Sequence, residues 1–381
     1  MTGKRDLSDL VLRLKIHGGW YDLGSRNLSY LQRFRLVCFV GMLPFILVAF
    51  FRAGLIETLN KSAYLSFGAV YVTVKAVSYY LQRDRTRLIV ERLVYLIQER
   101  RTPYDIQIFD RYSKLAWKSV YLLEVVSAIY VSSYFGFPMI YELGVCLAGT
   151  ADPGGEPYSF PHPLESLIPK RRSGLYYLIW FLSAVWCWLL LAYAIVSLGF
   201  LFVVVTYCCI LLRSLAKEIE AFSATPEDGR ALGRITLHYQ QLLQLSVDMK
   251  AVIGPPMAAQ NAVGALLLTL LVYNISHNLK GDPMLLMVNV FAWVTMINII
   301  FMSCLTGEML QAESQKIYES FCDLPYHEMP PKLRKALSFL ILLSLKPMVI
   351  NYKRKLPLNL RFFQEIVDSS YTYFMLLNSL A

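Results

Sequence analysis

Residues 358–381, LNLRFFQEIVDSSYTYFMLLNSLA, form the most informative segment of the chain. The segment has the roughly 20 residues that a helix needs to cross the apolar core of a bilayer. At helical spacing one stripe of it is largely polar, carrying Glu365, Asp368, Ser369, Thr372, Leu376 and Ser379. Hydrocarbon offers polar groups no hydrogen-bond partner, so the stripe is expected to face protein or water. Several copies of this helix around one axis would line a narrow cation path, which is our central hypothesis.

The composition of the whole chain is that of a membrane protein. Of 381 residues, 56% are hydrophobic and only 17% are charged, which is too apolar for a soluble chain of this length. A net charge of +10 would suit a nucleic-acid partner, but Lys and Arg lie between apolar runs, as in cytoplasmic flanks of membrane spans. The first 35 residues are polar and basic, so no cleavable signal peptide is expected.

Seven apolar segments are long enough to be membrane-spanning helices. They cover residues 36–56, 62–82, 119–139, 175–211, 257–279, 284–309 and 358–380. The fourth is too long for one crossing and is predicted to continue into the cytoplasm as helix. The sequence therefore predicts an all-α membrane protein with seven transmembrane helices.

The distribution of basic residues predicts the orientation. Thirty of the 37 Lys and Arg precede the first span or lie in residues 83–118, 213–250 and 310–361, against six in the alternate loops and span ends. Because cytoplasmic loops carry the excess of Lys and Arg, the amino terminus is expected inside and the carboxyl terminus outside. This is the reverse of a G-protein-coupled receptor.

Apolar stripes continue beyond the spans into the predicted cytoplasmic linkers. They comprise Ile89, Leu93 and Leu96, then Leu232, Ile235, Tyr239 and Leu242, then Leu310, Ile317, Phe321, Leu333, Leu337 and Leu340. We expect these stripes to pack on their own bundle or on a neighbouring subunit, in preference to lying on the membrane surface. The predicted division is a six-span bundle (1–309), cytoplasmic anchor helices (310–357) and the seventh span (358–381).

Residue patterns for enzyme chemistry are weak. The five His are far apart, and no HExxH, GxSxG or Gly-rich phosphate loop occurs. The seven Cys have no metal-ligand spacing. We therefore expect no catalytic residues, metal or cofactor, although a membrane enzyme stays an alternative because sites need not be sequential.

The carboxyl-terminal third resembles the insect odorant receptor family, which is related to insect gustatory receptors. The resemblance lies in CLTGEMLQAESQKIYESFCDLP (304–325), KLRKALSFLILLSLKPMVI (332–350) and LPLNLRFFQEIVDSSYTYFMLLNSL (356–380). It implies a tetrameric, ligand-gated, non-selective cation channel whose seventh spans line the pore. It also implies an odour-tuned subunit that assembles with a co-receptor into a heterotetramer in the plasma membrane of sensory-neuron dendrites.

The same resemblance assigns roles within the last span. The hydrophobic gate of the family falls on Leu376 and a polar pore position on Ser379, with Thr372 on the same stripe. The gustatory pattern TYxxxxxQF is half kept, since Ser379 and Leu380 replace Gln-Phe. Glu365 and Asp368 are predicted to attract cations at the inner mouth, or else to pair with Lys353, Arg354, Lys355 or Arg361. Alternatives are a homomeric channel of gustatory type and a metabotropic seven-span receptor.

A ligand pocket is expected in the outer half of the bundle, where apolar volatiles would arrive through or past the outer leaflet. Aromatic walls with a few hydroxyl or amide groups would suit a small, mostly apolar or aromatic ligand. The candidates are Tyr64, Phe67, Tyr71, Ser127, Tyr130, Tyr134, Tyr177, Trp180, Ala184, Asn289, Trp293 and Met296. The lone basic residue Lys75 is expected to form a buried ion pair, with Glu124 as the candidate partner.

Overall fold

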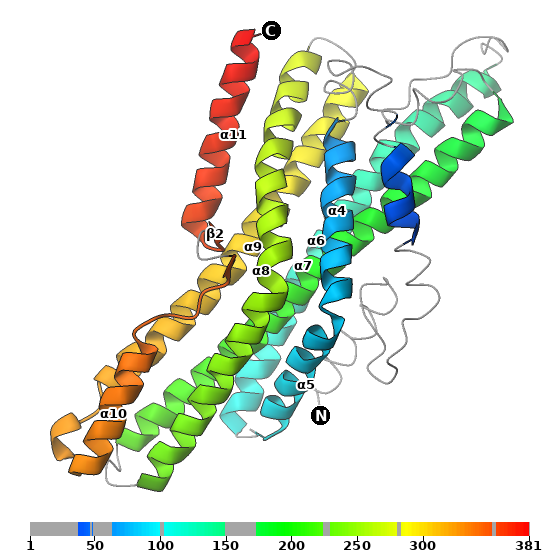
Figure 1. Ribbon diagram of the computed structural model, residues 1–381. Helices are drawn as coiled ribbons and strands as arrows, with labels where there is room; N and C mark the ends of the chain where they lie inside the picture. The colour runs from blue at the N-terminus through cyan, green and yellow to red at the C-terminus, as the bar shows by residue number, and fades with distance from the viewer. Residues whose placement is uncertain are drawn as a thin grey trace.

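A computed structural model describes residues 37–45, 48, 63–99, 103–148, 173–223, 229–279, 283–352 and 356–380. Its helices are α4 (Ala63–Leu81), α5 (Arg83–Glu99), α6 (Pro103–Leu147), α7 (Gly174–Ser223), α8 (Gly229–Asn278), α9 (Pro283–Cys322), η2 (Tyr326–Glu328), α10 (Pro331–Ser344) and α11 (Leu360–Leu380). Within these residues one short antiparallel hairpin joins β1 (Asn351–Tyr352) to β2 (Leu356–Pro357). The result is a long helical bundle, with α5 and α10 at its lower end and α11 at its upper end (Figure 1).

The helices coincide with the predicted spans wherever the structure describes them. Six of the seven spans match parts of α4, α6, α7, α8, α9 and α11 to within two residues at any end that extends beyond the helix, and residues 37–45 of the first span are also helical. Three helices in the described part of the chain are long and apolar enough to cross a membrane: Gly174–Phe222, Gly229–Ser276 and Leu286–Cys322. The all-helical architecture is consistent with the predicted membrane protein, whereas seven crossings, their orientation and the tetramer remain predictions.

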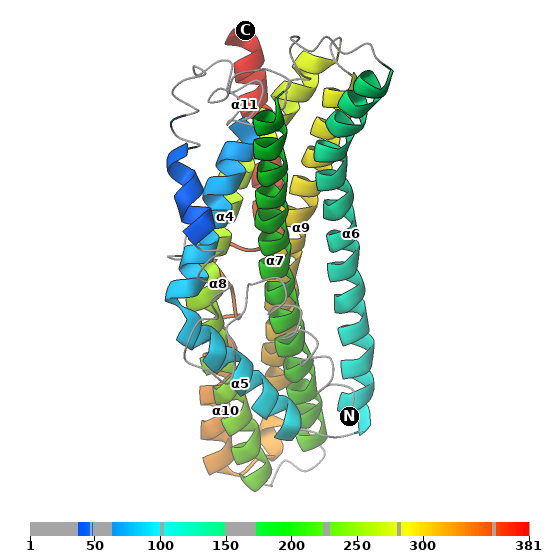
Figure 2. The same cartoon turned by 90° about the vertical axis from the view of Figure 1, so that its right-hand side faces the viewer.

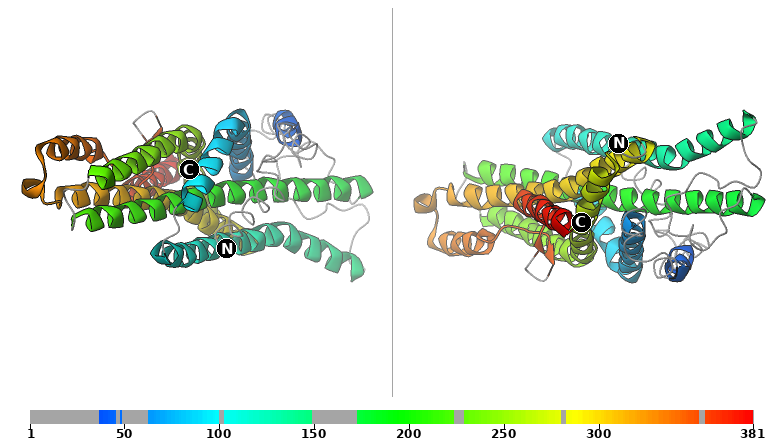
Figure 3. Two further views of the ribbon diagram at one scale, coloured as in Figure 1. Left: turned by 90° about the horizontal axis from the view of Figure 1, so that it is seen from below. Right: turned by 90° about the horizontal axis from the view of Figure 1, so that it is seen from above.

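Helix α7 is the central element of the bundle. It continues without a break for 50 residues, so the predicted extension of the fourth span as helix is confirmed. In Figure 2 it stands between α6 on one side and α4 with α5 on the other, and the end-on views of Figure 3 show the same arrangement. Its long uncharged run from Leu190 to Leu212 explains this place, because a helix that is apolar all round must be covered on every side.

The lower half of the bundle, formed by α5, α10 and the adjoining parts of α7, α8 and α9, contains the largest buried core. The predicted apolar stripes lie in it: Ile89, Leu93, Leu96, Leu232, Ile235, Tyr239, Leu242, Leu310, Ile317, Phe321, Leu337 and Leu340 are all buried, and Leu333 packs against them. These stripes therefore pack within this chain. The cluster draws on residues from both sides of position 310, so α5, α7 and α8 belong to the same packed unit as α9 and α10.

Two ion pairs at the edge of this core connect helices far apart in sequence. Arg213 of α7 pairs with Glu313 of α9, which Lys316 also contacts at 3.1 Å. Arg92 of α5 pairs with Asp248 of α8. Partly buried charges are stable only when paired, so these contacts favour one register of the four helices over its alternatives.

The connection from α10 to α11, which we call the strap (residues 345–352 and 356–359), crosses α8 and α9 at two glycines. A Cβ atom on Gly254 would lie 2.9 Å from the carbonyl oxygen of Asn351. A Cβ atom on Gly307 would overlap the carbonyl oxygen of Leu358 and lie 2.6 Å from its Cβ. Only glycine lets the strap approach the two helices this closely.

The start of α11 is fixed by two side chains. The side-chain oxygen of Asn359 accepts a hydrogen bond from the backbone N–H of Phe362 at 2.8 Å, as an N-cap residue does. Glu308 of α9 accepts from the N–H of Leu360 at 3.2 Å. A carboxylate is favourable at a helix amino terminus, so α9 both orients and stabilises the first turn of α11.

Candidate ligand pocket and pore helix

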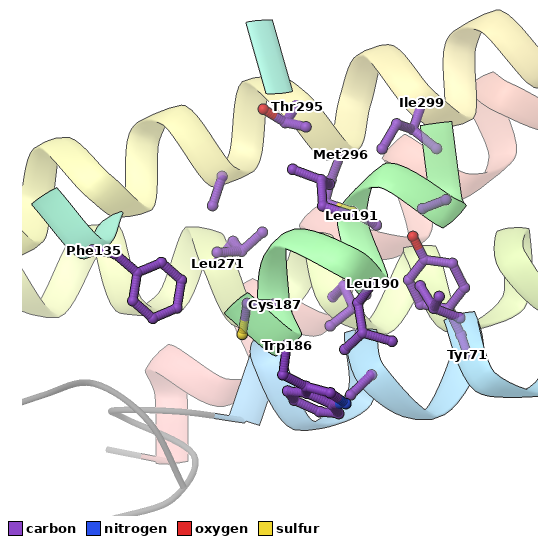
Figure 4. A pocket seen from close by; sticks show the side chains of 16 residues that line it. Tyr71, Phe135, Trp186, Cys187, Leu190, Leu191, Leu271, Thr295, Met296 and Ile299 are labelled. Atoms are coloured by element: carbon purple, nitrogen blue, oxygen red, sulfur yellow. The ribbon is translucent and has the colours of Figure 1, made fainter. Parts of the chain in front are cut away.

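A cavity of about 100 Å³ lies in the upper half of the bundle, between α4, α6, α7, α8 and α9. Its walls are Gly68, Ala69, Tyr71, Val72, Phe135, Trp186, Cys187, Leu190, Leu191, Ala194, Leu267, Leu271, Ala292, Thr295, Met296 and Ile299. Figure 4 shows the ring of Phe135 at one end, the indole of Trp186 along one side and Ile299 toward the other end. The concave shape and the apolar walls are those of a pocket for a small apolar molecule.

Among the described residues few polar groups reach this cavity, and none of the lining side chains is charged. Hydroxyl groups come from Tyr71 on α4 and Thr295 on α9, which lie on different walls in Figure 4. Thr295 Oγ1 donates its hydrogen to the carbonyl oxygen of Phe291 at 2.8 Å. Cys187 adds a thiol, while the indole nitrogen of Trp186 is fully buried. A bound molecule would therefore be held mainly by apolar contact and oriented by one or two hydrogen bonds.

Six of the predicted ligand residues lie at or around the cavity. Tyr71 and Met296 line it directly. Phe67, Trp180, Ala184 and Trp293 pack against the buried cluster that surrounds it. Trp180 also contacts the ring of Phe135 edge-on, with 6.4 Å between ring centroids, so it supports the outer wall without entering the lining.

The other predicted residues lie elsewhere or outside the described side chains. Ser127 and Asn289 are fully buried but do not line the cavity. Tyr177 is 36% exposed near the start of α7. The side chains of Tyr64, Tyr130 and Tyr134 are outside the described part of the chain.

Sequence reasoning missed several residues of the cavity wall. Leu267 and Leu271 of α8 had no predicted role, and Trp186 and Leu190 lie deeper along α7 than the predicted Trp180. The only sequence signal for these α8 residues is that Leu267 and Leu271 are apolar and four residues apart. Any buried helix face has this spacing, so it does not indicate a cavity.

Lys75 does not form the expected ion pair with Glu124. Its Nζ donates to the side-chain oxygen of Gln260 on α8 at 2.7 Å, and both side chains are fully buried. A carboxylate is the usual partner of a buried lysine, whereas α8, which packs extensively on α4, presents an amide at this level. The long-range contact ties α4 to α8 one turn below Tyr71.

The predicted pore stripe of α11 is exposed in this chain. Glu365, Asp368, Ser369, Thr372, Leu376 and Ser379 are all exposed, with Leu376 at 56%. The opposite face packs on α8 and α9, where Ile366 and Ser370 are buried. Arg361 lies 3.4 Å from Glu365, and both groups are solvent-exposed, so this pair is weak. Lys353, Arg354 and Lys355 are outside the described residues.

Contact between α11 and the bundle weakens toward the carboxyl end of the helix. Ile366 is 4% exposed, yet Tyr373, two turns further along the same face, is 56% exposed. The Thr269 hydroxyl of α8 donates chiefly to the carbonyl oxygen of Ala265 at 2.9 Å and reaches that of Ser370 on α11 only at 3.3 Å, a weak contact between the two helices. The outer half of α11 therefore has apolar and polar surface that its own chain does not cover.

Packing connects the cavity directly to α11. Met296 lines the cavity and also packs against the cluster of Ile300, Cys304 and Ile366. Ile299, the next turn of the cavity wall, is adjacent in sequence to Ile300 of that cluster. Helix α9 thus contacts the cavity with one face, the middle of α11 with another, and the first turn of α11 through Glu308.

Comparison with known proteins shows which family and which solved structures this architecture is similar to. The family model for the 7tm odorant receptor matches residues 55–371. Odorant receptor 82a of Drosophila melanogaster is 27% identical over 141 residues, which cover 36% of this chain and 36% of that receptor. The structure of the insect olfactory receptor OR5 from Machilis hrabei in complex with eugenol superposes with a TM-score of 0.82 at 14% identity, covering 99% of this chain and 98% of that one. The structure of OR5 alone gives a TM-score of 0.78.

Proposed function

We propose that this chain, which belongs to the 7tm odorant receptor family, is the odour-tuned subunit of a ligand-gated cation channel in the plasma membrane. A small volatile binds in the cavity between α4, α6, α7, α8 and α9. Binding opens a non-selective pore lined by α11 helices, contributed by this chain and by co-receptor subunits in a heterotetramer. The eugenol complex of the Machilis receptor supports a small organic ligand, although at 14% identity that likeness reaches only the fold.

The observation that carries the proposal is the two-sided character of α11. One face is packed on α8 and α9, while the polar stripe and the outer half of the helix are exposed. Carboxylates and hydroxyls facing lipid would be costly, so this surface calls for water or neighbouring subunits. If the α11 helices of several subunits surround one axis, the polar stripe faces water along the axis and the rest of the exposed surface faces neighbouring subunits.

Hydroxyl chemistry along the stripe suits cations. Ser369, Thr372 and Ser379 donate their hydrogens to carbonyl oxygens one turn earlier, at 2.7, 2.9 and 2.7 Å. Each hydroxyl oxygen therefore presents only lone pairs to the outside, as an acceptor. With Glu365 and Asp368 toward the inner end, a ring of such stripes would attract cations and disfavour anions.

The proposed gate is a ring of Leu376 side chains. Leu376 lies on the exposed stripe between Thr372 and Ser379, so a converging ring of leucines would interrupt the polar path. A narrow apolar ring excludes water and closes a pore without a mechanical plug, and slight widening restores conduction.

Coupling between pocket and gate runs along α9 in this proposal. A ligand that displaces Met296 presses on the cluster of Ile300 and Ile366, where α9 meets the middle of α11. Because Tyr373 and the residues beyond it are loosely held, a small shift at Ile366 moves the outer end of α11 further than its base.

The proposal is tested by recording currents in cells that express this chain with the co-receptor, this chain alone or the co-receptor alone. We expect volatile-evoked cation current only where this chain is present, with ligand preferences that change when Met296 or Tyr71 is substituted. Current from this chain alone would favour the homomeric alternative. Absence of current across a broad panel, despite surface expression, would refute the channel function.

A further inference from the structure

We propose that the cavity favours compact, neutral alcohols over ketones and hydrocarbons of the same shape, with the ligand hydroxyl donating to Thr295 and accepting from Tyr71. This inference rests on the proposed function and narrows its ligand class. Three features of the cavity support it: its size, the absence of charge on its lining, and the hydrogen-bonding state of its two hydroxyl groups.

Size limits the ligand to a small ring or a short chain. The cavity holds about 100 Å³, whereas an apolar protein cavity of about 150 Å³ accommodates benzene. A ligand with a single six-membered ring therefore requires only a modest expansion of the cavity. Met296 can supply it, because a methionine side chain is unbranched and adapts to irregular space.

Charge selects against ions. In the described part of the chain no charged side chain lines the cavity, and the buried Lys75 one turn below Tyr71 is already bonded to Gln260. An ammonium or carboxylate ligand would lose its hydration without gaining a partner of opposite charge. The ligand is therefore neutral.

Thr295 determines which hydrogen-bonding group is preferred. Its Oγ1 hydrogen is given to the carbonyl oxygen of Phe291, so the hydroxyl can offer the cavity an acceptor but no donor. Asn289, about two turns outward from Met296 on the same side of α9, has a fully buried side-chain oxygen with no partner among the described residues. Within the cavity lining, the α9 wall thus offers the Thr295 oxygen as an acceptor, with a second unpartnered acceptor, Asn289, further outward along the helix, and a ligand that donates a hydrogen to Thr295 satisfies the first.

Tyr71 supplies the complementary group. Its phenol reaches the cavity from α4, on a different wall from Thr295 (Figure 4), and a phenol can both donate and accept. An alcohol donates to Thr295 and accepts from Tyr71. A ketone can only accept, so it leaves the Thr295 oxygen without a partner, and a hydrocarbon leaves both hydroxyls without one.

The test uses cyclohexanol, cyclohexanone and methylcyclohexane, which have the same number of heavy atoms and differ in the group attached to the ring. Half-maximal concentrations are recorded for the full chain with its co-receptor, and for Thr295→Val, Tyr71→Phe and Thr73→Val. Thr73 is the matched control, because it is a buried threonine bonded to the carbonyl oxygen four residues earlier and does not line the cavity.

We expect cyclohexanol to be about tenfold more potent than cyclohexanone, the equivalent of one neutral hydrogen bond. Thr295→Val should bring this ratio close to one, and Thr73→Val should leave it unchanged. Tyr71→Phe should weaken alcohol and ketone together, since both accept from the phenol. Equal potency of the ketone in the unmodified chain, or an unchanged ratio in Thr295→Val, would overturn the inference.

Ligand-induced stabilisation of the purified full chain separates this inference from the channel proposal. A rise in unfolding temperature that is largest with cyclohexanol, without current from any volatile, refutes the channel and retains the ligand class. Currents evoked by other volatiles, with neither binding nor current from the three ring compounds, refute the ligand class and retain the channel.

Discussion

The lower and upper halves of the bundle are built from the same long helices but packed differently. In the lower half, side chains such as Ile317, Phe321 and Leu337 are completely buried in one continuous core. In the upper half the same helices surround a cavity, and the outer end of α11 is largely exposed. Close packing resists deformation, whereas a cavity lacks contacts on its inner side.

This difference separates two roles. The lower half holds α7, α8, α9 and α10 in one register, and the strap fixes where α11 begins. The upper half leaves room for a small molecule and for movement of α11. In the proposed mechanism a ligand acts locally, because the helices around the cavity are held together at their other end.

The largest expected effect comes from opening a hole in the lower core. Phe321→Ala removes a fully buried ring that contacts Tyr239 edge-on, with 5.8 Å between centroids. Loss of such a side chain costs about 3–5 kcal/mol. Surface expression and unfolding temperature should both fall sharply. Phe339→Ala on α10, where the ring is 60% exposed, is the control and should lower stability much less. Similar losses of stability in the two variants would mean that the lower half is not the tightly packed region.

A smaller effect is expected at the crossing of the strap. Gly307→Ala places a methyl group against Leu358, so the strap must move, at a cost of about 1–3 kcal/mol. Because Leu358 precedes α11, we expect altered gating as well as lower stability, measured as a shifted ligand dose–response in channels that reach the surface. Gly233→Ala is the control, since nothing lies within 4 Å of its added methyl. Normal currents and stability in Gly307→Ala would show that the strap does not position the pore helix.

The smallest change in stability, with a specific change in current, is expected from Leu376→Ala. The residue is 56% exposed in this chain, so truncation should hardly affect folding. A smaller apolar ring excludes water less effectively, which should raise current without ligand. Tyr371→Ala, which is 62% exposed but lies off the polar stripe, serves as control. Unchanged basal and evoked currents in Leu376→Ala would remove the gate assignment.

On α7, helical periodicity predicted which side of the helix faces the cavity but not how deep along the helix the cavity lies. On α7 the prediction named Tyr177, Trp180 and Ala184, and the walls are Cys187, Leu191 and Ala194, on the same stripe further along the helix. Depth depends on helix tilt and on which levels leave space between helices. Both follow from packing across five helices, so a single sequence does not contain them.

Buried polar partners were predicted least well. Lys75 pairs with Gln260, 185 residues away on α8, and spacing along one helix does not indicate which side chain of another helix lies at its level. By contrast, the stripes of Leu93, Leu242 and Ile317 could be predicted, since each repeats at helical spacing among polar neighbours. Which surface they would cover, their own chain or another, required the structure.

The central claim is that the polar stripe of α11 faces a water-filled path shared between subunits. Cysteine accessibility tests it directly, with a charged thiol reagent applied from outside while ligand holds the channel open. Thr372→Cys on the stripe should be modified and lose most of its current. Tyr371→Cys places the thiol on an exposed neighbour that lies off the stripe. Channels with Tyr371→Cys, and channels without any substitution, should keep their current. Block of Tyr371→Cys with Thr372→Cys unaffected would place the conducting path elsewhere and contradict the account.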